Sequence, residues 1–434
     1  MLPRILLLNP PIYDFAAYDF WLKPYGMLSV AGFLRGKADF LLFDFLDRLH
    51  PFSANRQELK SDRFGRGRFY EKIIPHPPPL ANIPRYFRRY GLPRDIFEDF
   101  LQRETPCDFV LIQTSMTYWY PGVKEVIRDV RNTWPKAKTI LGGNYVTLCK
   151  THAEKLQADL LIYHNNLQPL WKYLDAEPDL NQPALWEIYQ NLNTGILKLS
   201  DGCPFNCTYC SVPIVYGKFK ARPLERSLAE LDLLAERGVA NIAFYDDALL
   251  FDDQNVIIPF LSRVIKRNIN LNFHTPNALN ARFITKELAQ LMVAAGFKTF
   301  YLGFESKSPA WQKKTGSKIS CDELARAVGH LIAAGANKQN ITAYQILGHP
   351  QMDTQDLEAS MHFVNRLGVR GMLADFSPIP GTPDGDYCRQ YVDMTEPLMH
   401  NKSAFGVIAF GFDEINRLKD LQRKLNRNIL KPPA

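Results

Sequence analysis

Three cysteines lie within eight residues of this chain, in the stretch SDGCPFNCTYCS. They are Cys203, Cys207 and Cys210; the other four cysteines are scattered, and none is paired at metal-ligand spacing. A structural zinc site needs four ligands, a disulfide would leave one thiol over, and three thiolates on one loop can hold three irons of a cubane cluster. The fourth iron then stays open to a bound molecule. The alternative is zinc with a distant fourth ligand, such as Cys321 or a histidine.

The elements that must position this loop are apolar runs that alternate with helical patterns. Before the loop this alternation predicts an α/β fold with a doubly wound parallel sheet. After a polar, proline-marked linker the alternation resumes six times, which is typical of a parallel (β/α)6 partial barrel with its functional groups at the carboxyl ends of the strands. The predicted boundaries are 1–175 for the front domain, 176–193 for the linker, 194–385 for the barrel and 386–434 for a C-terminal helical extension.

One segment of the front domain, at about 51–105, is rich in proline, arginine and aromatic residues and interrupts the alternation, so we interpret it as an insertion. Between Arg56 and Arg94 it carries ten Lys or Arg against three Asp or Glu, a local excess equal to the net charge of +7 of the whole chain. The rest of the chain is therefore neutral. Such a patch is able to meet an anionic ligand, or it is a solvated insertion that packs over the front domain.

The cellular context follows from what the sequence lacks. Seven cysteines with no disulfide-like spacing favour a reducing compartment. The amino-terminal MLPRILLLNPP reads as a buried strand rather than a signal peptide, and no apolar stretch approaches the length of a transmembrane helix. We therefore expect a cytoplasmic protein with no membrane span. No recognised RNA-binding module is present, so no nucleic-acid partner is predicted.

The spacing CxxxCxxC, with the aromatic Tyr209 directly before the third cysteine, resembles the radical S-adenosylmethionine (SAM) superfamily. The resemblance implies that the three cysteines hold a [4Fe–4S] cluster whose open iron binds SAM. It further implies reductive cleavage of SAM to a 5′-deoxyadenosyl radical. An electron donor such as flavodoxin or ferredoxin would then be a partner, together with a small-molecule substrate.

Further residues carry over from the same resemblance, strand by strand. Asp246 and Asp247, in FYDDALL, stand where the superfamily binds the methionine amine, in place of its commoner Gly-Gly-Glu. Carboxylates there would accept hydrogen bonds from an ammonium group, although paired Asp are also good turn residues and helix caps. Glu305 and Ser306, in LGFES, resemble the GxES motif and would meet the ribose or the methionine end of SAM; the competing interpretation of Glu305 is a buried structural acid.

The remaining barrel motifs concern the adenine and the substrate. The turns ILGHPQ and SPIPGT resemble those that close strands five and six of the superfamily, and they would shape the adenine site together with Tyr209. Tyr209 is alternatively a filler of the loop. On strand three, His274, Asn277 and Asn280 are expected to project near the barrel mouth, with His274 and Asn277 as candidate catalytic residues; a lone histidine is often structural.

The order of a doubly wound domain followed by this barrel resembles the radical SAM subgroup with an N-terminal cobalamin-binding domain, and SMTYWYPGV together with FYDDALL resembles an uncharacterised branch of that subgroup. The motifs LLLNPP, YGMLSVAGFLR and TILGGNYVTL fit that subgroup, which implies cobalamin as a third cofactor. In this chain the loop after the first strand contains no histidine, so we do not expect that loop to supply a lower axial imidazole to cobalt. The candidate corrinoid-binding residues are Thr114, Ser115, Gly142, Gly143 and Thr147. Glycines also serve tight turns without any ligand.

The function predicted from these residues is cobalamin-dependent methylation of an unactivated carbon by a radical SAM enzyme. The alternative enzyme keeps the front domain as a scaffold and performs a rearrangement, ring contraction or sulfur insertion without cobalamin. From another class, the chain would be a non-catalytic sensing module for cobalamin or metal. The cysteine triad argues against that class, because a binding module gains nothing from an open iron.

Overall fold

A computed structural model describes residues 2–430, and these residues divide into two compact units. The front unit contains residues 2–195 with 229–239 and 393–401, and the barrel unit contains the remainder. Among the described residues, no helix is both long and apolar enough to cross a membrane.

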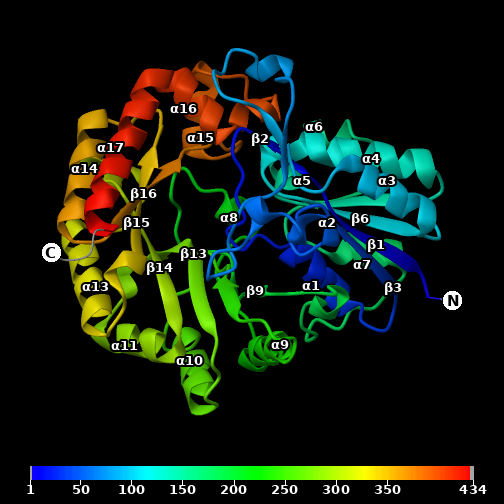
Figure 1. Cartoon of the computed structure of the whole chain (residues 1–434), viewed down its shortest axis with the longest axis horizontal. Coiled ribbons are helices and arrows are strands. Elements are labelled where there is room, and N and C mark those ends of the chain that lie inside the picture. The colour runs from blue at the N-terminus through cyan, green and yellow to red at the C-terminus, as the bar shows by residue number, and fades with distance from the viewer. Residues whose placement is uncertain (1, 431–434) are drawn as a thin grey trace. The chain divides into compact units, whose positions relative to one another are not determined.

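The front unit is built on a five-stranded parallel sheet in the order β3-β1-β6-β7-β8. The interior strand β1 is fully buried along Ile5–Leu8, as expected for a parallel sheet with helices on both faces. In Figure 1, α3 and α4 cover one face, and α1 and α7 cover the other. The sheet strands are β1 (Arg4–Asn9), β3 (Asp39–Asp44), β6 (Phe109–Thr114), β7 (Lys138–Gly143) and β8 (Leu160–Ile162). The helices are α1 (Tyr25–Phe33), α3 (Arg94–Arg103), α4 (Tyr120–Thr133), α5 (Asn144–Leu148), α6 (Lys150–Glu154) and α7 (Gln168–Leu174).

This strand order is that of a doubly wound parallel sheet, in which successive strands are added toward one edge up to β3 and toward the other edge from β6 on. Ligands of such sheets bind outside the carboxyl ends of the strands where the strand order reverses, here between β1 and β6. The order therefore assigns the place where a cofactor of this unit is expected.

Most of the segment at 51–105 forms a small subdomain, and α3 at its end covers a face of the front sheet (Figure 1). The strands β4 (Glu71–Ile73) and β5 (Arg88–Tyr90) join β2 (Ile12–Asp14) in an antiparallel sheet, preceded by the short helix α2 (Pro51–Ala54). Arg89 pairs with Glu125 of α4 at 2.7 Å. Arg94 pairs with Asp129 of the same helix at 2.8 Å. Part of the local basic excess is therefore matched by acids elsewhere in the front unit and attaches the insertion to it.

The barrel unit contains six parallel strands that follow one another in chain order, β9-β12-β13-β14-β15-β16. Helices between them cover the outer side of the sheet (Figure 1). This architecture confirms the predicted fold class. The strands are β9 (Thr194–Leu197), β12 (Asn241–Phe244), β13 (Asn272–Asn280), β14 (Phe297–Glu305), β15 (Ile341–Leu347) and β16 (Arg370–Asp375). The helices between them are α8 (Val212–Val215), α9 (Leu224–Glu236), α10 (Ile257–Lys266), α11 (Lys286–Ala295), α12 (Pro309–Thr315), α13 (Cys321–Ala333) and α14 (Thr354–Arg366).

Three helices follow the last strand: α15 (Pro383–Tyr387), α16 (Lys402–Phe410) and α17 (Phe412–Leu430). The apolar face of α17 is buried through Ile415 and Leu418, which pack in one cluster with Leu347 of β15 and Met361 of α14. This helix belongs to the segment predicted as a C-terminal helical extension, and in Figure 1 it lies on the outer layer of the barrel unit.

Candidate active site

The cysteine loop leaves the first barrel strand through a two-stranded clasp. The strands β10 (Ser200–Asp201) and β11 (Lys220–Ala221) pair in antiparallel fashion and close the loop at its base. Gly202 lies next to the clasp with φ of 71°, and a Cβ there would stand 2.4 Å from the carbonyl oxygen of Lys218. Only glycine fits this close approach of two backbones, so the glycine before the first cysteine has a local structural reason.

The three thiols of the loop are free and half-buried. Burial raises the pKa of Cys203, Cys207 and Cys210, to about 12 for Cys210. Because metal ligands are thiolates, a bound cation has to supply the charge that favours deprotonation. This donor set fits an iron–sulfur cluster, which thiolates hold.

The alternative of a zinc site would require a fourth ligand from outside the cysteine loop. Within residues 2–430, no three His, Cys, Asp or Glu side chains are arranged around a position for a single metal ion. Cys321, named as a possible fourth ligand, has its sulfur 3.9 Å from the carbonyl oxygen of Lys307.

Asp246 stabilises the entry to the cysteine loop. Its Oδ1 accepts hydrogen bonds from the backbone N–H groups of Leu199 and Ser200, at 2.9 and 2.6 Å, and from the Ser200 hydroxyl at 2.7 Å. The side chain is almost fully buried, which raises the pKa of its carboxyl group. Its other oxygen, Oδ2, is buried without a hydrogen-bond partner. Oδ1 of Asp246 therefore has a structural role, because it fixes the backbone at the entry to the cysteine loop.

Asp247 is the more accessible of the two carboxylates. Burial raises its pKa to about 6, and the nearby Asp246 and Asp201 oppose its ionisation further. The Lys198 ammonium lies 3.9 Å from its Oδ2, which has no hydrogen bond. Lys198 itself donates to Asp201 at 2.9 Å. A buried carboxylate with unused acceptor capacity is suited to bind a cationic group.

Glu305 ends strand β14 in a conformation that is unusual for a residue with a side chain. Its φ is 66°, and the register between β14 and β15 shifts between Gly303 and Glu305. Such outliers concentrate at functional sites. The carboxylate accepts a hydrogen bond from Lys318 at 2.7 Å. Burial works against the charged ammonium of Lys318, but Glu305 outweighs it and raises the pKa of Lys318.

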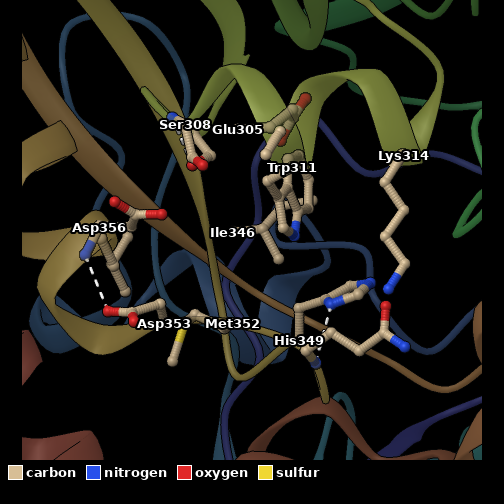
Figure 2. A pocket seen from close by; sticks show the side chains of 13 residues that line it. Glu305, Ser308, Trp311, Lys314, Ile346, His349, Met352, Asp353 and Asp356 are labelled. Atoms are coloured by element: carbon tan, nitrogen blue, oxygen red, sulfur yellow. Dashed lines mark hydrogen bonds between the residues drawn. The ribbon is translucent and has the colours of Figure 1, made fainter.

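A cavity of about 240 Å³ opens beside Glu305 and Ser306, at the carboxyl ends of β14 and β15 (Figure 2). Side chains from β14, α12, β15 and α14 surround it. The lining residues are Glu305, Ser306, Ser308, Ala310, Trp311, Lys314, Ile346, His349, Gln351, Met352, Asp353, Asp356 and Leu357. The two residues of the LGFES motif thus share one cavity with the turn ILGHPQ, as the resemblance implied for a SAM site.

Aromatic rings connect this cavity to the cysteine loop. Tyr209 lies nearly parallel to Trp311, with ring centroids 6.2 Å apart. Trp311 in turn meets His349 edge to face at 5.5 Å. Tyr209 of the cysteine loop therefore packs against Trp311, which lines the cavity.

The two candidate catalytic residues of β13 have structural contacts. His274 is the third residue of the strand and fully buried; Thr299 and Asn241 each lie 3.0 Å from one of its ring nitrogens. This position is deep in the sheet, at the amino-terminal part of the strand and not at the mouth. Asn277 is exposed and donates to the backbone carbonyl of Tyr245 at 3.1 Å. The geometry favours a structural role for His274 and leaves Asn277 near the Asp246–Asp247 turn.

The candidate corrinoid residues cluster at the carboxyl end of the front sheet, where several of them bond within the protein. The Thr114 hydroxyl donates to the carbonyl of Gly142 at 3.0 Å. The Thr147 hydroxyl accepts from the backbone of His164 at 2.7 Å. Gly143 has φ of 120°, and a Cβ there would lie 2.0 Å from the Thr114 carbonyl oxygen. Packing inside the sheet therefore explains this glycine without a ligand.

Ser115 faces a small cavity of about 20 Å³ where β1 and β6 diverge. Asn9, Gln113 and Lys23 also line it, and Lys23 is only 7% exposed. A small crevice with polar side chains therefore lies at the position where a cofactor of this sheet is expected.

Comparison with known proteins agrees with this geometry. Residues 197–364 match the family model described as the Radical SAM superfamily. The chain contains a radical SAM domain. The matched region holds the cysteine loop, the Asp246–Asp247 turn and the LGFES motif, so the superfamily recognised from the sequence is confirmed. Radical SAM domains use a [4Fe–4S] cluster and SAM, which supports these two predicted cofactors.

Relatives of the radical SAM domain include two curated proteins. One is an uncharacterized methyltransferase of Pyrococcus horikoshii, 28% identical over 198 residues, or 44% of this chain and 41% of that protein. The other is the threonylcarbamoyladenosine tRNA methylthiotransferase MtaB of Thermotoga maritima, 23% identical over 60% of this chain and 64% of that protein. The matches thus span less than two thirds of either relative.

A solved structure extends the likeness beyond the radical SAM domain. The radical SAM methyltransferase TsrM of Kitasatospora setae, with cobalamin and a [4Fe–4S] cluster bound, superposes with a TM-score of 0.65 and 13% identity. The superposition covers 93% of this chain and 85% of that one. The two proteins therefore share a fold across both units.

Several residues of the site were not identified from the sequence. Lys198 is a charged residue within the apolar run GILKLSDG, and this irregularity was the one available signal for it. Trp311 lies in a short helical pattern and Lys318 in the polar loop that follows it. In sequence, neither segment differs from an ordinary surface segment. Their roles arise from tertiary contacts with Glu305 and Tyr209.

Proposed function

We propose that the chain is a radical enzyme that binds a [4Fe–4S] cluster through Cys203, Cys207 and Cys210 and cleaves SAM. The observation that carries this proposal is the set of three free, half-buried thiols on one clasped loop within the radical SAM domain. When bound, the cluster would supply the electron that breaks the carbon–sulfur bond of SAM.

The residues of this chain would hold SAM from two sides. Asp247 would accept the methionine ammonium, because its carboxylate is buried, has a free acceptor oxygen and lies on the turn after β12. Asp246 would keep Ser200 and the clasp in place. Glu305 and Ser306 would contact the ribose in the 240 Å³ cavity, with Tyr209 beside the adenine.

For the reaction outcome we propose cobalamin-dependent methylation of an unactivated carbon, with the corrinoid at the carboxyl end of the front sheet. The shared fold with a cobalamin-bound methyltransferase and the polar crevice beside Ser115 support it. The corrinoid would supply the methyl group. The loop after β1 contains no histidine, so the cobalt would lack a protein imidazole from that loop. A small-molecule acceptor and an electron donor such as flavodoxin or ferredoxin complete the scheme.

An absorption spectrum of anaerobically purified protein, with iron and sulfide analysis, tests the central proposal. We expect cluster absorption, about four irons per chain as a [4Fe–4S] cluster requires, and formation of 5′-deoxyadenosine from SAM and dithionite. Replacing the three loop cysteines by Ala should abolish all three results, whereas replacing Cys107, Cys149, Cys321 and Cys388 should not. Stoichiometric zinc, or a full cluster in the triple variant, would refute the proposal.

A test of corrinoid uptake distinguishes cobalamin-dependent methylation from a cobalamin-independent reaction. Binding of hydroxocobalamin by protein with an intact cluster supports the methyltransferase, and the electron paramagnetic resonance spectrum of the cobalt(II) form reports the lower ligand. Nitrogen splitting from a protein histidine would refute the ligand expectation. Lack of uptake would favour a cobalamin-independent reaction such as sulfur insertion, which the methylthiotransferase relative makes the specific alternative.

A further inference from the structure

Thr208 lies between the second and third cysteines of the loop, and three of its polar groups are held by other elements. Its backbone N–H donates to the carbonyl of Thr315 at the end of α12, at 3.3 Å. Its carbonyl accepts from the backbone N–H of Asp384 at 3.1 Å. Its hydroxyl donates to Asp384 Oδ2 at 2.7 Å. The loop is therefore fixed at this one residue from two directions.

Asp384 is itself held in place. His349 Nε2 lies 2.9 Å from the same Oδ2, and the His349 ring is 1% exposed. The backbone N–H of Gln351 donates to His349 Nδ1 at 3.2 Å, so the ring proton is on Nε2 and is donated to Asp384. Asp384 also sits in the first turn of α15, where Thr382 caps the helix through the N–H of Gly385 at 3.0 Å.

We propose that Asp384 is a positioning residue that sets the conformation of the loop between Cys207 and Cys210. Asp384 forms two hydrogen bonds with Thr208: its backbone N–H donates to the Thr208 carbonyl, and its carboxylate accepts from the Thr208 hydroxyl. Together these bonds fix the position and the orientation of the Thr208 backbone. The turn that follows, in which Cys210 N–H donates to the Cys207 carbonyl at 3.0 Å, then presents both sulfurs. This inference rests on the proposed function in that these sulfurs are taken as cluster ligands.

The same network reaches the cavity. His349 lines it and meets Trp311 edge to face. A molecule bound in the cavity would therefore touch a residue that holds Asp384, and through it the cysteine loop.

Thiol alkylation of the full-length, cluster-free protein tests the proposal without requiring iron. Iodoacetamide labelling is followed by mass spectrometry for each cysteine. In Asp384→Ala we expect labelling of Cys207 and Cys210 to accelerate about 10-fold, the effect of losing one hydrogen bond to a charged group. Labelling of Cys107 should keep its wild-type rate, and labelling of Cys388 should accelerate far less than 10-fold, because both thiols are buried and Asp384 contributes to the raised pKa of Cys388 only after burial.

Matched variants separate positioning from loss of structure. Thr208→Val removes the hydroxyl and should act in the same direction, whereas Thr208→Ser should not. Asp384→Asn should stay near wild type, because one oxygen accepts both side-chain hydrogen bonds and an amide oxygen can replace it. Asp386→Ala, on the exposed side of the same helix, is the control.

Two results would overturn the proposal: equal acceleration at Cys388 in Asp384→Ala, which would mean that α15 has come apart, or no acceleration at Cys207 and Cys210. In cluster-loaded protein, Asp384→Ala should also shift the midpoint potential and the electron paramagnetic resonance spectrum of the reduced cluster. If both measurements stayed unchanged, they too would contradict the positioning role of Asp384. A wild-type chain that takes up no cluster would refute the proposed function while leaving the labelling result interpretable.

Discussion

Asp247→Asn should stabilise the unliganded protein while weakening its affinity for SAM. The folded protein raises the pKa of Asp247 to about 6 from 3.8, because the charged carboxylate is buried with only 15% of its side chain exposed. A shift of this size means that ionisation costs the folded state about 2–3 kcal/mol at pH 7. Asn carries no charge and avoids this cost.

The sign of the effect can be followed with pH. Between pH 3.8 and 6 the folded protein binds more protons at Asp247 than the unfolded chain does, so stability falls as the pH rises through this window. The advantage of Asp247→Asn should be greatest at pH 7, fall to about half by pH 5, and nearly vanish below pH 4. Urea denaturation of the cluster-free protein at these pH values measures it.

The opposite effect is expected on the ligand. Losing one charge-assisted hydrogen bond to an ammonium group should raise the Kd for SAM about 10- to 100-fold in cluster-loaded protein. Asp252→Asn, on an exposed part of the same loop, is the control. Asp246→Ala should instead lower stability by about 3–5 kcal/mol, because it leaves three buried donors without an acceptor. An Asp247→Asn variant that is less stable than wild type at pH 7, or that binds SAM equally well, would refute the reasoning.

Three further substitutions test other parts of the structure. Lys318→Met should lower stability by about 3 kcal/mol, because Glu305 is left as an unpaired buried charge; adding Glu305→Gln should restore most of it, and a failure to restore it would contradict this ion-pair account. Arg89→Ala should cost about 3 kcal/mol through the unpaired Glu125 and should speed tryptic cleavage within 51–105; unchanged proteolysis would argue against this anchor. Gly143→Ala should destabilise the front unit by about 2 kcal/mol or more even without a corrinoid, because its Cβ would meet a backbone carbonyl; equal thermal stability would show that the backbone can shift.

The sequence predicted the parts of the fold that depend on local pattern. Fully buried parallel strands produce uninterrupted apolar runs such as RILLL, and the cysteine spacing marks a metal-binding loop without reference to distant residues. Both features are encoded within short stretches of chain. The fold class and the radical SAM domain could therefore be predicted from the order of residues alone.

Roles that depend on side-chain direction and depth could not be predicted in this way. Adjacent Asp246 and Asp247 look alike in sequence, yet Oδ1 of Asp246 accepts three hydrogen bonds from the entry to the cysteine loop, whereas Oδ2 of Asp247 lies 3.9 Å from the Lys198 ammonium. His274 was expected at the barrel mouth, but it is only the third residue of a nine-residue strand and lies in the interior. Lys318 pairs with Glu305 only because the folded chain brings the loop after α12 next to the end of β14.

The clasp formed by β10 and β11 bears on the order of events during maturation. Closing a free loop of the length between Gly202 and Phe219 costs about 2–3 kcal/mol of chain entropy. Here the backbone pairing of Ser200 with Ala221 and the ion pair of Arg222 with Asp201 are expected to offset that loss of entropy while the polypeptide folds. Small zinc domains fold only when their metal binds, whereas this chain should reach its native shape first. The cellular machinery that delivers iron and sulfide would then meet a folded acceptor, and loss of the cluster by oxidation should leave a protein that can be reloaded instead of one that must be degraded.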